Sequence, residues 1–145
     1  GDDRWREILH ARFVSVAHLV PSGFRWIVEG PVWALDGELF GLGSDRRIDH
    51  VLVERLVTLA TDLGAWAVNI HAVDGSNDPG VVNAASRTRA IDRAVPFLTW
   101  YVRTCRDAGV VPLVENVPPI CRMRRESFVF TPGAAIVSRV FLVVV

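Results

Sequence analysis

Three side chains able to bind a metal ion or to move a proton lie at or near the ends of apolar runs: His18, His71 and Glu115. Imidazole nitrogen and carboxylate oxygen together suit zinc, manganese, iron or cobalt better than calcium. Each residue also has a simpler interpretation. A histidine at the end of a strand is often just hydrogen-bonded, and a glutamate before a proline-rich turn can cap backbone amides. The residue types alone allow both a metal site and ordinary structural roles.

The runs that carry these residues have the composition of strands. They are apolar, rich in β-branched residues and followed by turn or polar residues: Phe13–Val20, Ala65–His71 and Val110–Glu115. Two segments between them repeat apolar residues with helical spacing: His50–Leu63, which Asp49 can cap, and about Ala84–Ala108. This alternation, with strands that are apolar along their whole length, predicts parallel strands covered on both faces. Because parallel strands end at the same edge of a sheet, the three side chains are expected to converge.

The connection between the first expected strand and the first helix, residues 24–48, is unusually long. It is rich in glycine and tryptophan and too irregular for a helix. A connection of this length is either functional, as a lid or a wall of a binding site, or folded on itself, for example as a hairpin around Gly30-Pro31. Trp33 in this connection could pack against the fold or could stack on a bound ring.

Composition restricts the class of protein. The 145 residues are 50% hydrophobic and 22% charged, which predicts one folded domain and excludes a disordered chain. Lys+Arg and Asp+Glu both number 16, so no net charge recruits nucleic acid or an anionic membrane. The two cysteines have no metal or redox spacing, and no stretch approaches the roughly 20 apolar residues of a membrane span. We therefore expect a soluble cytoplasmic domain.

Two stretches resemble a known superfamily. Leu63–His71 is an apolar strand ending in histidine, and Val114–Pro118 is a strand end of the form Glu-Asn-x-Pro. As a pair they resemble the xylose isomerase-like TIM-barrel superfamily, which includes sugar phosphate isomerases, ketose epimerases and the endonuclease IV family. Val14–His18 is similar to a further strand of that family that ends in histidine.

The resemblance implies a fold. It covers about residues 5–132 and corresponds to strands two to four of eight, so residues 1–145 are expected to form a single, incomplete domain of the α/β class. That domain would be part of a (β/α)₈ TIM barrel in which parallel strands alternate with helices. Residues 133–145 form an anomalous apolar tail without a counterpart.

The resemblance also implies a function, which differs by branch. In the isomerase and epimerase branch, Glu115 matches a ligand of a divalent metal (Mn, Zn, Mg or Co) and His71 faces a carbohydrate substrate. The reaction is then proton transfer next to a carbonyl, and the second carboxylate that it needs is missing. In the endonuclease IV-like branch, His18, His71 and Glu115 all match metal ligands of a DNA-repair nuclease. A catalytically incomplete, non-enzymatic fragment is the third possibility, with self-association through exposed sheet edges.

Four residues are candidates for substrate contact. Trp33, in the long connection, could stack on a sugar ring. Asn116 directly follows Glu115, and Arg122 and Arg124 lie further along in an arginine-rich loop. The two arginines could hold a phosphate through forked hydrogen bonds, or could belong to a solvated loop with Glu126 as their partner.

Overall fold

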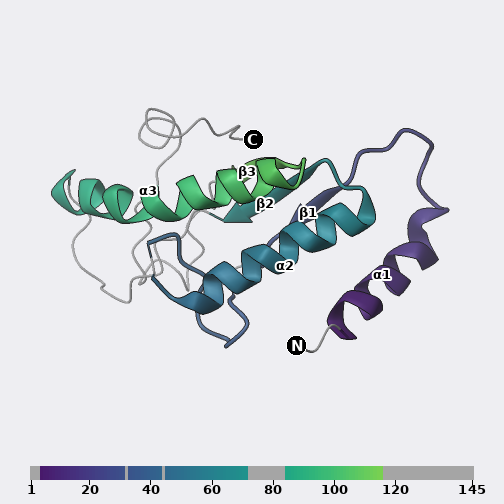
Figure 1. Ribbon diagram of the computed structural model, residues 1–145, viewed down its shortest axis with the longest axis horizontal. Helices are drawn as coiled ribbons and strands as arrows, with labels where there is room; N and C mark the ends of the chain where they lie inside the picture. The colour runs from purple at the N-terminus through teal and green to yellow at the C-terminus, as the bar shows by residue number, and fades with distance from the viewer. Residues whose placement is uncertain (1–3, 32, 44, 72–83, 116–145) are drawn as a thin grey trace.

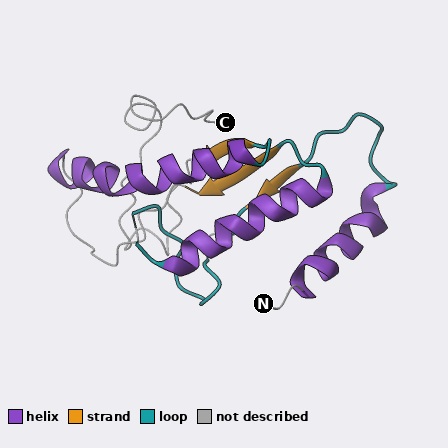
Figure 2. Ribbon diagram, viewed as in Figure 1, coloured by secondary structure: helices purple, strands orange, loops and turns teal. Residues whose placement is uncertain are grey.

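The computed structural model describes residues 4–31, 33–43, 45–71 and 84–115. Helices and strands alternate along the chain: α1 Arg4–Ala17, β1 Ile27–Glu29, α2 Arg47–Leu63, β2 Ala67–His71, α3 Ala84–Asp107 and β3 Val111–Glu115 (Figures 1 and 2). The strands form one parallel sheet in the order β1-β2-β3. The α/β class and the parallel sheet predicted from the sequence are confirmed. The described residues form three strands and no closed barrel, so the barrel stays a prediction.

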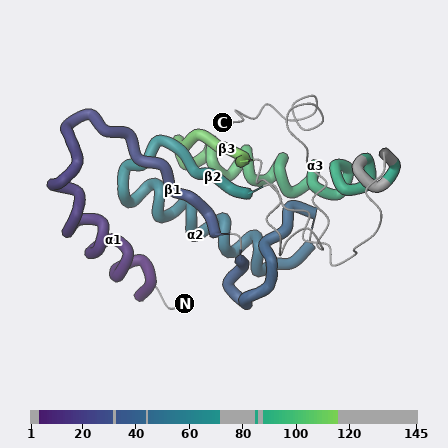
Figure 3. Tube along the Cα trace, turned by 180° about the vertical axis from the view of Figure 1, so that it is seen from behind, coloured from purple at the N-terminus to yellow at the C-terminus, as the bar shows by residue number. Residues whose placement is uncertain are grey.

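Helices α2 and α3 cover the same face of the sheet, whereas the sequence predicted cover on both faces; within the described residues, no helix of the sheet's connections lies on the other face. The two helices lie in front of the strands in Figure 1 and behind them in Figure 3. The strand residues that join the core with these helices are Val28, Val68, Ile70 and Val114. Since side chains alternate between the two faces of a strand, the residues at the intervening positions point away from both helices. Those positions include Glu29, Asn69, His71 and Glu115.

Helix α2 begins earlier than the sequence predicted. It starts at Arg47, and Asp49 lies in its first turn instead of capping it. The buried Asp49 carboxylate accepts two hydrogen bonds from the Arg46 guanidinium, at 2.8 and 3.1 Å. The helix ends as predicted at Leu63, because Gly64 adopts a left-handed conformation (φ 63°) and directs its N–H to the last carbonyls.

The prediction of a strand over Phe13–Val20 is wrong, because helix α1 continues to Ala17. The partly buried side chains Trp5, Phe13 and Ala17 are separated by multiples of four residues, which places them on one helical face. Helix α1 packs against α2, and the Phe13 ring contacts Trp26 at 4.5 Å between ring centroids. None of the residues of α1 is buried.

The connection over residues 24–48 contains the first strand of the sheet, which the sequence had placed at Phe13–Val20. β1 runs from Ile27 to Glu29 within it and pairs with β2. The predicted hairpin forms a few residues later than expected, with Trp33 bridged to Leu39 and a turn at Gly37 (φ 84°). Arg46 links this hairpin to the start of α2. Its guanidinium donates to the Leu39 carbonyl at 3.0 Å as well as to the Asp49 carboxylate.

Tyr101 joins α3 to the sheet. Its side chain is fully buried, and its hydroxyl donates to the Val68 carbonyl of β2 at 2.6 Å. The same oxygen accepts the N–H of Leu113 in β3 at 3.3 Å. Val68 pairs with Pro112, which has no N–H to offer the ladder. The hydroxyl therefore adds hydrogen bonds across the β2–β3 junction beside the proline.

Cys105 should be inert while the protein is folded. It is fully buried on α3, and burial raises the pKa of its thiol to about 12 from 9.0. Since only the thiolate reacts, its population at pH 8 is lower by about a thousandfold in the folded chain. We expect iodoacetamide to label Cys105 at least about a hundredfold more slowly in native protein than in urea, measured by peptide mass spectrometry. Equal rates in both states would contradict the burial of this thiol.

No helix in the described part of the chain is long and apolar enough to cross a bilayer.

Candidate metal centre

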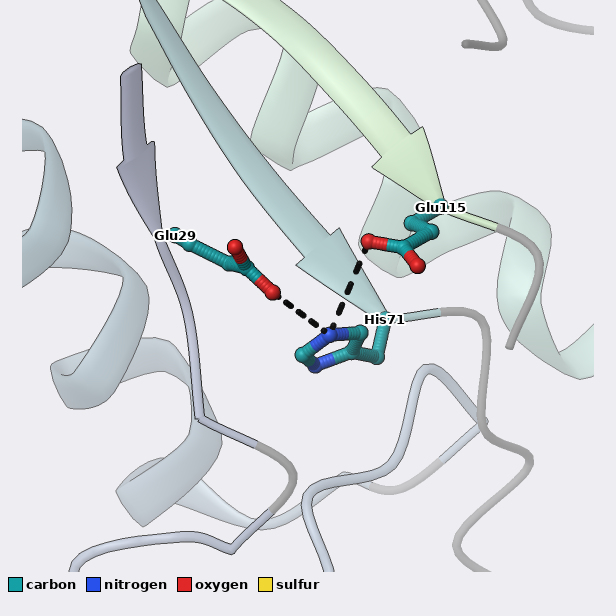
Figure 4. A group of neighbouring side chains, drawn as sticks. All are labelled: Glu29, His71 and Glu115. Carbon is teal, nitrogen blue, oxygen red and sulfur yellow. Dashed lines mark ion pairs between the residues drawn. The ribbon is translucent and has the colours of Figure 1, made fainter. Parts of the chain in front are cut away.

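Glu29, His71 and Glu115 converge at the carboxyl ends of the three strands (Figure 4). The His71 Nε2 atom lies 3.3 Å from Glu29 Oε1 and 3.9 Å from Glu115 Oε2. One ligand atom from each residue lies within 4.8 Å of the others. Each residue is the last of its strand, so the parallel sheet itself brings the three side chains together.

The register of the sheet explains the convergence. Glu29 pairs with Asn69, two residues before His71, and His71 pairs with Glu115. These positions share the face that α2 and α3 leave free, so the two carboxylates flank the imidazole from both neighbouring strands.

Gly30 lets β1 come close enough to β2 for this arrangement. Its N–H donates to the Asn69 carbonyl at 2.8 Å. A Cβ atom at position 30 would lie 3.2 Å from that carbonyl oxygen and 3.0 Å from the Leu56 Cδ1 atom. A larger residue would press against both, so glycine permits the close pairing that places Glu29 beside His71.

Burial differs sharply among the three side chains. The His71 side chain is 9% exposed, whereas those of Glu29 and Glu115 are 64% and 42% exposed. The imidazole therefore forms the floor of the site, and the carboxylates can be approached from solvent. His71 Nδ1 is buried and makes no hydrogen bond within the part of the chain that the structure describes.

This donor set fits a divalent transition metal ion. Two carboxylate oxygens and one imidazole nitrogen suit Mn²⁺, Zn²⁺ or Co²⁺, and their negative charge would be compensated by the ion. Three protein ligands leave coordination positions for water or substrate, as catalytic sites require. The ion would bind His71 through Nε2, the ring nitrogen that faces both carboxylates.

Asn69 adds a fourth polar side chain to the same face. Its Nδ2 atom donates to Glu115 Oε2 at 3.0 Å, the carboxylate oxygen nearest to His71.

The structure brings together only part of the predicted site. His71 and Glu115 lie at adjacent strand ends, as expected. His18 does not end a strand; it follows α1 in a turn, and it is not part of the Glu29–His71–Glu115 group. Trp33 is half exposed in the hairpin after β1. The predicted substrate contacts Asn116, Arg122 and Arg124, and the apolar tail 133–145, lie outside the described residues.

Sequence reasoning missed Glu29, which adds a second carboxylate to this group of side chains. The signal was present: Ile27-Val28-Glu29 is a short β-branched run that ends at an acidic residue before Gly30-Pro31. The other two strands end in the same way, at a side chain able to bind metal.

Comparison of this chain with models of known protein families, with curated proteins and with solved structures finds no match. The chemistry of the site must therefore be inferred from its geometry.

Proposed function

We propose that Glu29, His71 and Glu115 hold one divalent metal ion, and that the centre serves a sugar or sugar-phosphate isomerase or epimerase reaction. The observation that carries this proposal is the convergence of the three side chains at the ends of parallel strands. Active sites of parallel α/β folds lie at this end of the sheet.

The topology of the chain supports a (β/α)₈ barrel. The strands follow one another in sequence order, and both connecting helices, α2 and α3, pack on one face. Consecutive units of a (β/α)₈ barrel have this arrangement, whereas doubly wound sheets carry helices on both faces. In a barrel, Glu29, His71 and Glu115 would point into the interior at its catalytic end.

Two carboxylates and an imidazole provide what proton transfer next to a carbonyl requires. A bound divalent ion would polarise the substrate oxygens and stabilise the negative charge that develops on them. Glu29 is the most exposed of the three and can reach a substrate above the sheet, so we assign the role of accepting the proton to its second carboxylate oxygen, the one that does not bind the ion. His71 and Glu115 are held more firmly and would keep the site assembled.

The endonuclease-type alternative is less well supported. Its ligand set requires His18, which lies after α1 and not at a strand end. The zero net charge also provides no general attraction for a nucleic acid backbone. The carbohydrate substrate, the cytoplasmic location and self-association through sheet edges remain predictions.

Mn²⁺ titration by calorimetry, followed by proton exchange in D₂O, tests the proposal. We expect about one Mn²⁺ per chain. With Mn²⁺ present, we also expect deuterium to enter the carbon next to the carbonyl of a small ketose, followed by NMR. The matched controls are His71→Ala, which should lose both properties, and His10→Ala, an exposed histidine on α1 that should keep both. Absence of Mn²⁺ binding would reject the metal centre; binding without exchange would reject the reaction and leave a non-enzymatic metal site.

A further inference from the structure

Asn69 occupies a central position beneath the metal centre. It pairs with Glu29 across β1–β2 and precedes His71 by two residues on the same face of β2. Its amide nitrogen donates to Glu115 Oε2 at 3.0 Å. The side chain is half buried. It contacts the Glu115 carboxylate and lies beside Glu29 on the neighbouring strand.

Burial does not hold the Glu115 side chain in place. Glu115 is the last residue of β3, and its side chain is 42% exposed. A free glutamate side chain populates many rotamers, and fixing it costs conformational entropy. The oxygen held by Asn69 is the same one that lies 3.9 Å from His71 Nε2. The hydrogen bond thus keeps this oxygen directed at the imidazole.

We propose that Asn69 is a positioning residue, whose amide fixes Glu115 and so preorganises the metal centre. This inference rests on the proposed metal binding by Glu29, His71 and Glu115. A carboxylate oxygen has two lone pairs, so Oε2 can accept the Asn69 N–H and still offer a lone pair to an ion. Outer hydrogen bonds of this kind orient metal ligands and typically change metal affinity by about ten- to a hundredfold.

The neutral amide suits this role better than a charged group. An aspartate at position 69 could only accept hydrogen bonds at neutral pH, and it would repel Glu115. An amide turned the other way would place its oxygen against a carboxylate oxygen, so the orientation with Nδ2 toward Glu115 is the one that the hydrogen bond requires.

A purely structural role for the Asn69 side chain can be separated from this one. The pairing of β1 with β2 at this point uses the backbone, because Gly30 N–H donates to the Asn69 carbonyl at 2.8 Å. Removing the side chain leaves that bond in place. Loss of the amide should therefore change metal affinity without a comparable change in the stability of the metal-free protein.

The test is a double-mutant cycle of Mn²⁺ affinity on the full chain, with Asn69→Ala, Glu115→Ala and the double variant. We expect Asn69→Ala to weaken Mn²⁺ binding by about ten- to a hundredfold. In the Glu115→Ala background the same substitution should have no further effect, because its target is gone. The melting temperature without metal should be nearly unchanged. Asn69→Thr, which is β-branched and too short to reach Glu115, should reproduce the loss if the alanine variant folds poorly.

Two results would overturn the inference while leaving the metal centre intact: unchanged Mn²⁺ affinity in Asn69→Ala, or an equal loss with and without Glu115. Failure of the unmodified chain to bind Mn²⁺ would instead overturn the proposed function, and the role of Asn69 with it.

Discussion

Glu29→Gln is expected to weaken Mn²⁺ binding by about a hundredfold, whereas His18→Ala is expected to leave the dissociation constant unchanged. The sequence alone indicated a site of His18, His71 and Glu115, while the structure joins Glu29 to the latter two. Removal of one charged ligand from a three-residue site should cost about 3 kcal/mol of binding free energy, which is about two powers of ten in affinity. Glutamine keeps the size of Glu29 and removes its charge.

Calorimetric titration of the two variants beside the unmodified chain measures this difference. Glu54→Gln is the matched control for charge, because Glu54 is an exposed glutamate on α2 outside the site. It should bind Mn²⁺ as the unmodified chain does. Strong weakening in His18→Ala together with normal binding in Glu29→Gln would show that the sequence-based set was right and that the convergence at β1 is incidental.

Tyr101→Phe is expected to lower the free energy of unfolding by about 1–3 kcal/mol. The substitution keeps the ring in the core and removes only the hydroxyl that donates to Val68 and accepts from Leu113. Buried backbone groups that lose a partner in this way retain their desolvation cost without compensation. Tyr101→Ala should cost more, about 3–5 kcal/mol, because it also leaves a cavity among α3, β2 and β3.

Urea unfolding followed by circular dichroism provides both values. Thr99→Val is a suitable control, since the exposed Thr99 hydroxyl donates only to the Val95 carbonyl of its own helix. Its effect should stay within about 0.5 kcal/mol. If Tyr101→Phe were as stable as the unmodified protein, the hydroxyl would contribute nothing to the β2–β3 junction, and the role assigned to it would be wrong.

Much of the fold could be predicted because several elements have strong local signals. α2 and α3 repeat apolar residues with helical spacing, and Gly64 and Gly109 end them in left-handed conformations. β2 and β3 are short apolar runs directly after those glycines, so their ends at His71 and Glu115 were predicted correctly. These two residues accordingly form the part of the candidate site that sequence reasoning found.

The first 30 residues could not be predicted in the same way, because their pattern is ambiguous. Phe13–Val20 is rich in β-branched residues, which is typical of a strand, yet Val14 and Val16 are about half exposed. The helical conformation is stabilised by contacts with α2 and Trp26, which are distant in sequence. β1 has three residues, too few for a periodic signal, and its two outer residues are exposed. Its identity depends on pairing with β2, which is a long-range contact. Glu29 was therefore missed along with its strand.

Helix α1 is attached weakly to the rest of the protein, so we expect it to unfold locally before the sheet does. The Arg6–Asp62 ion pair and the Trp5 ring beneath Arg55 tie α1 to α2, and such surface interactions contribute at most about 1 kcal/mol each. No residue of α1 belongs to the core, so we expect the sheet with α2 and α3 to stay intact when α1 detaches. Backbone amides of α1 should exchange with deuterium through local opening, whereas those of β2 should exchange only when the whole sheet unfolds.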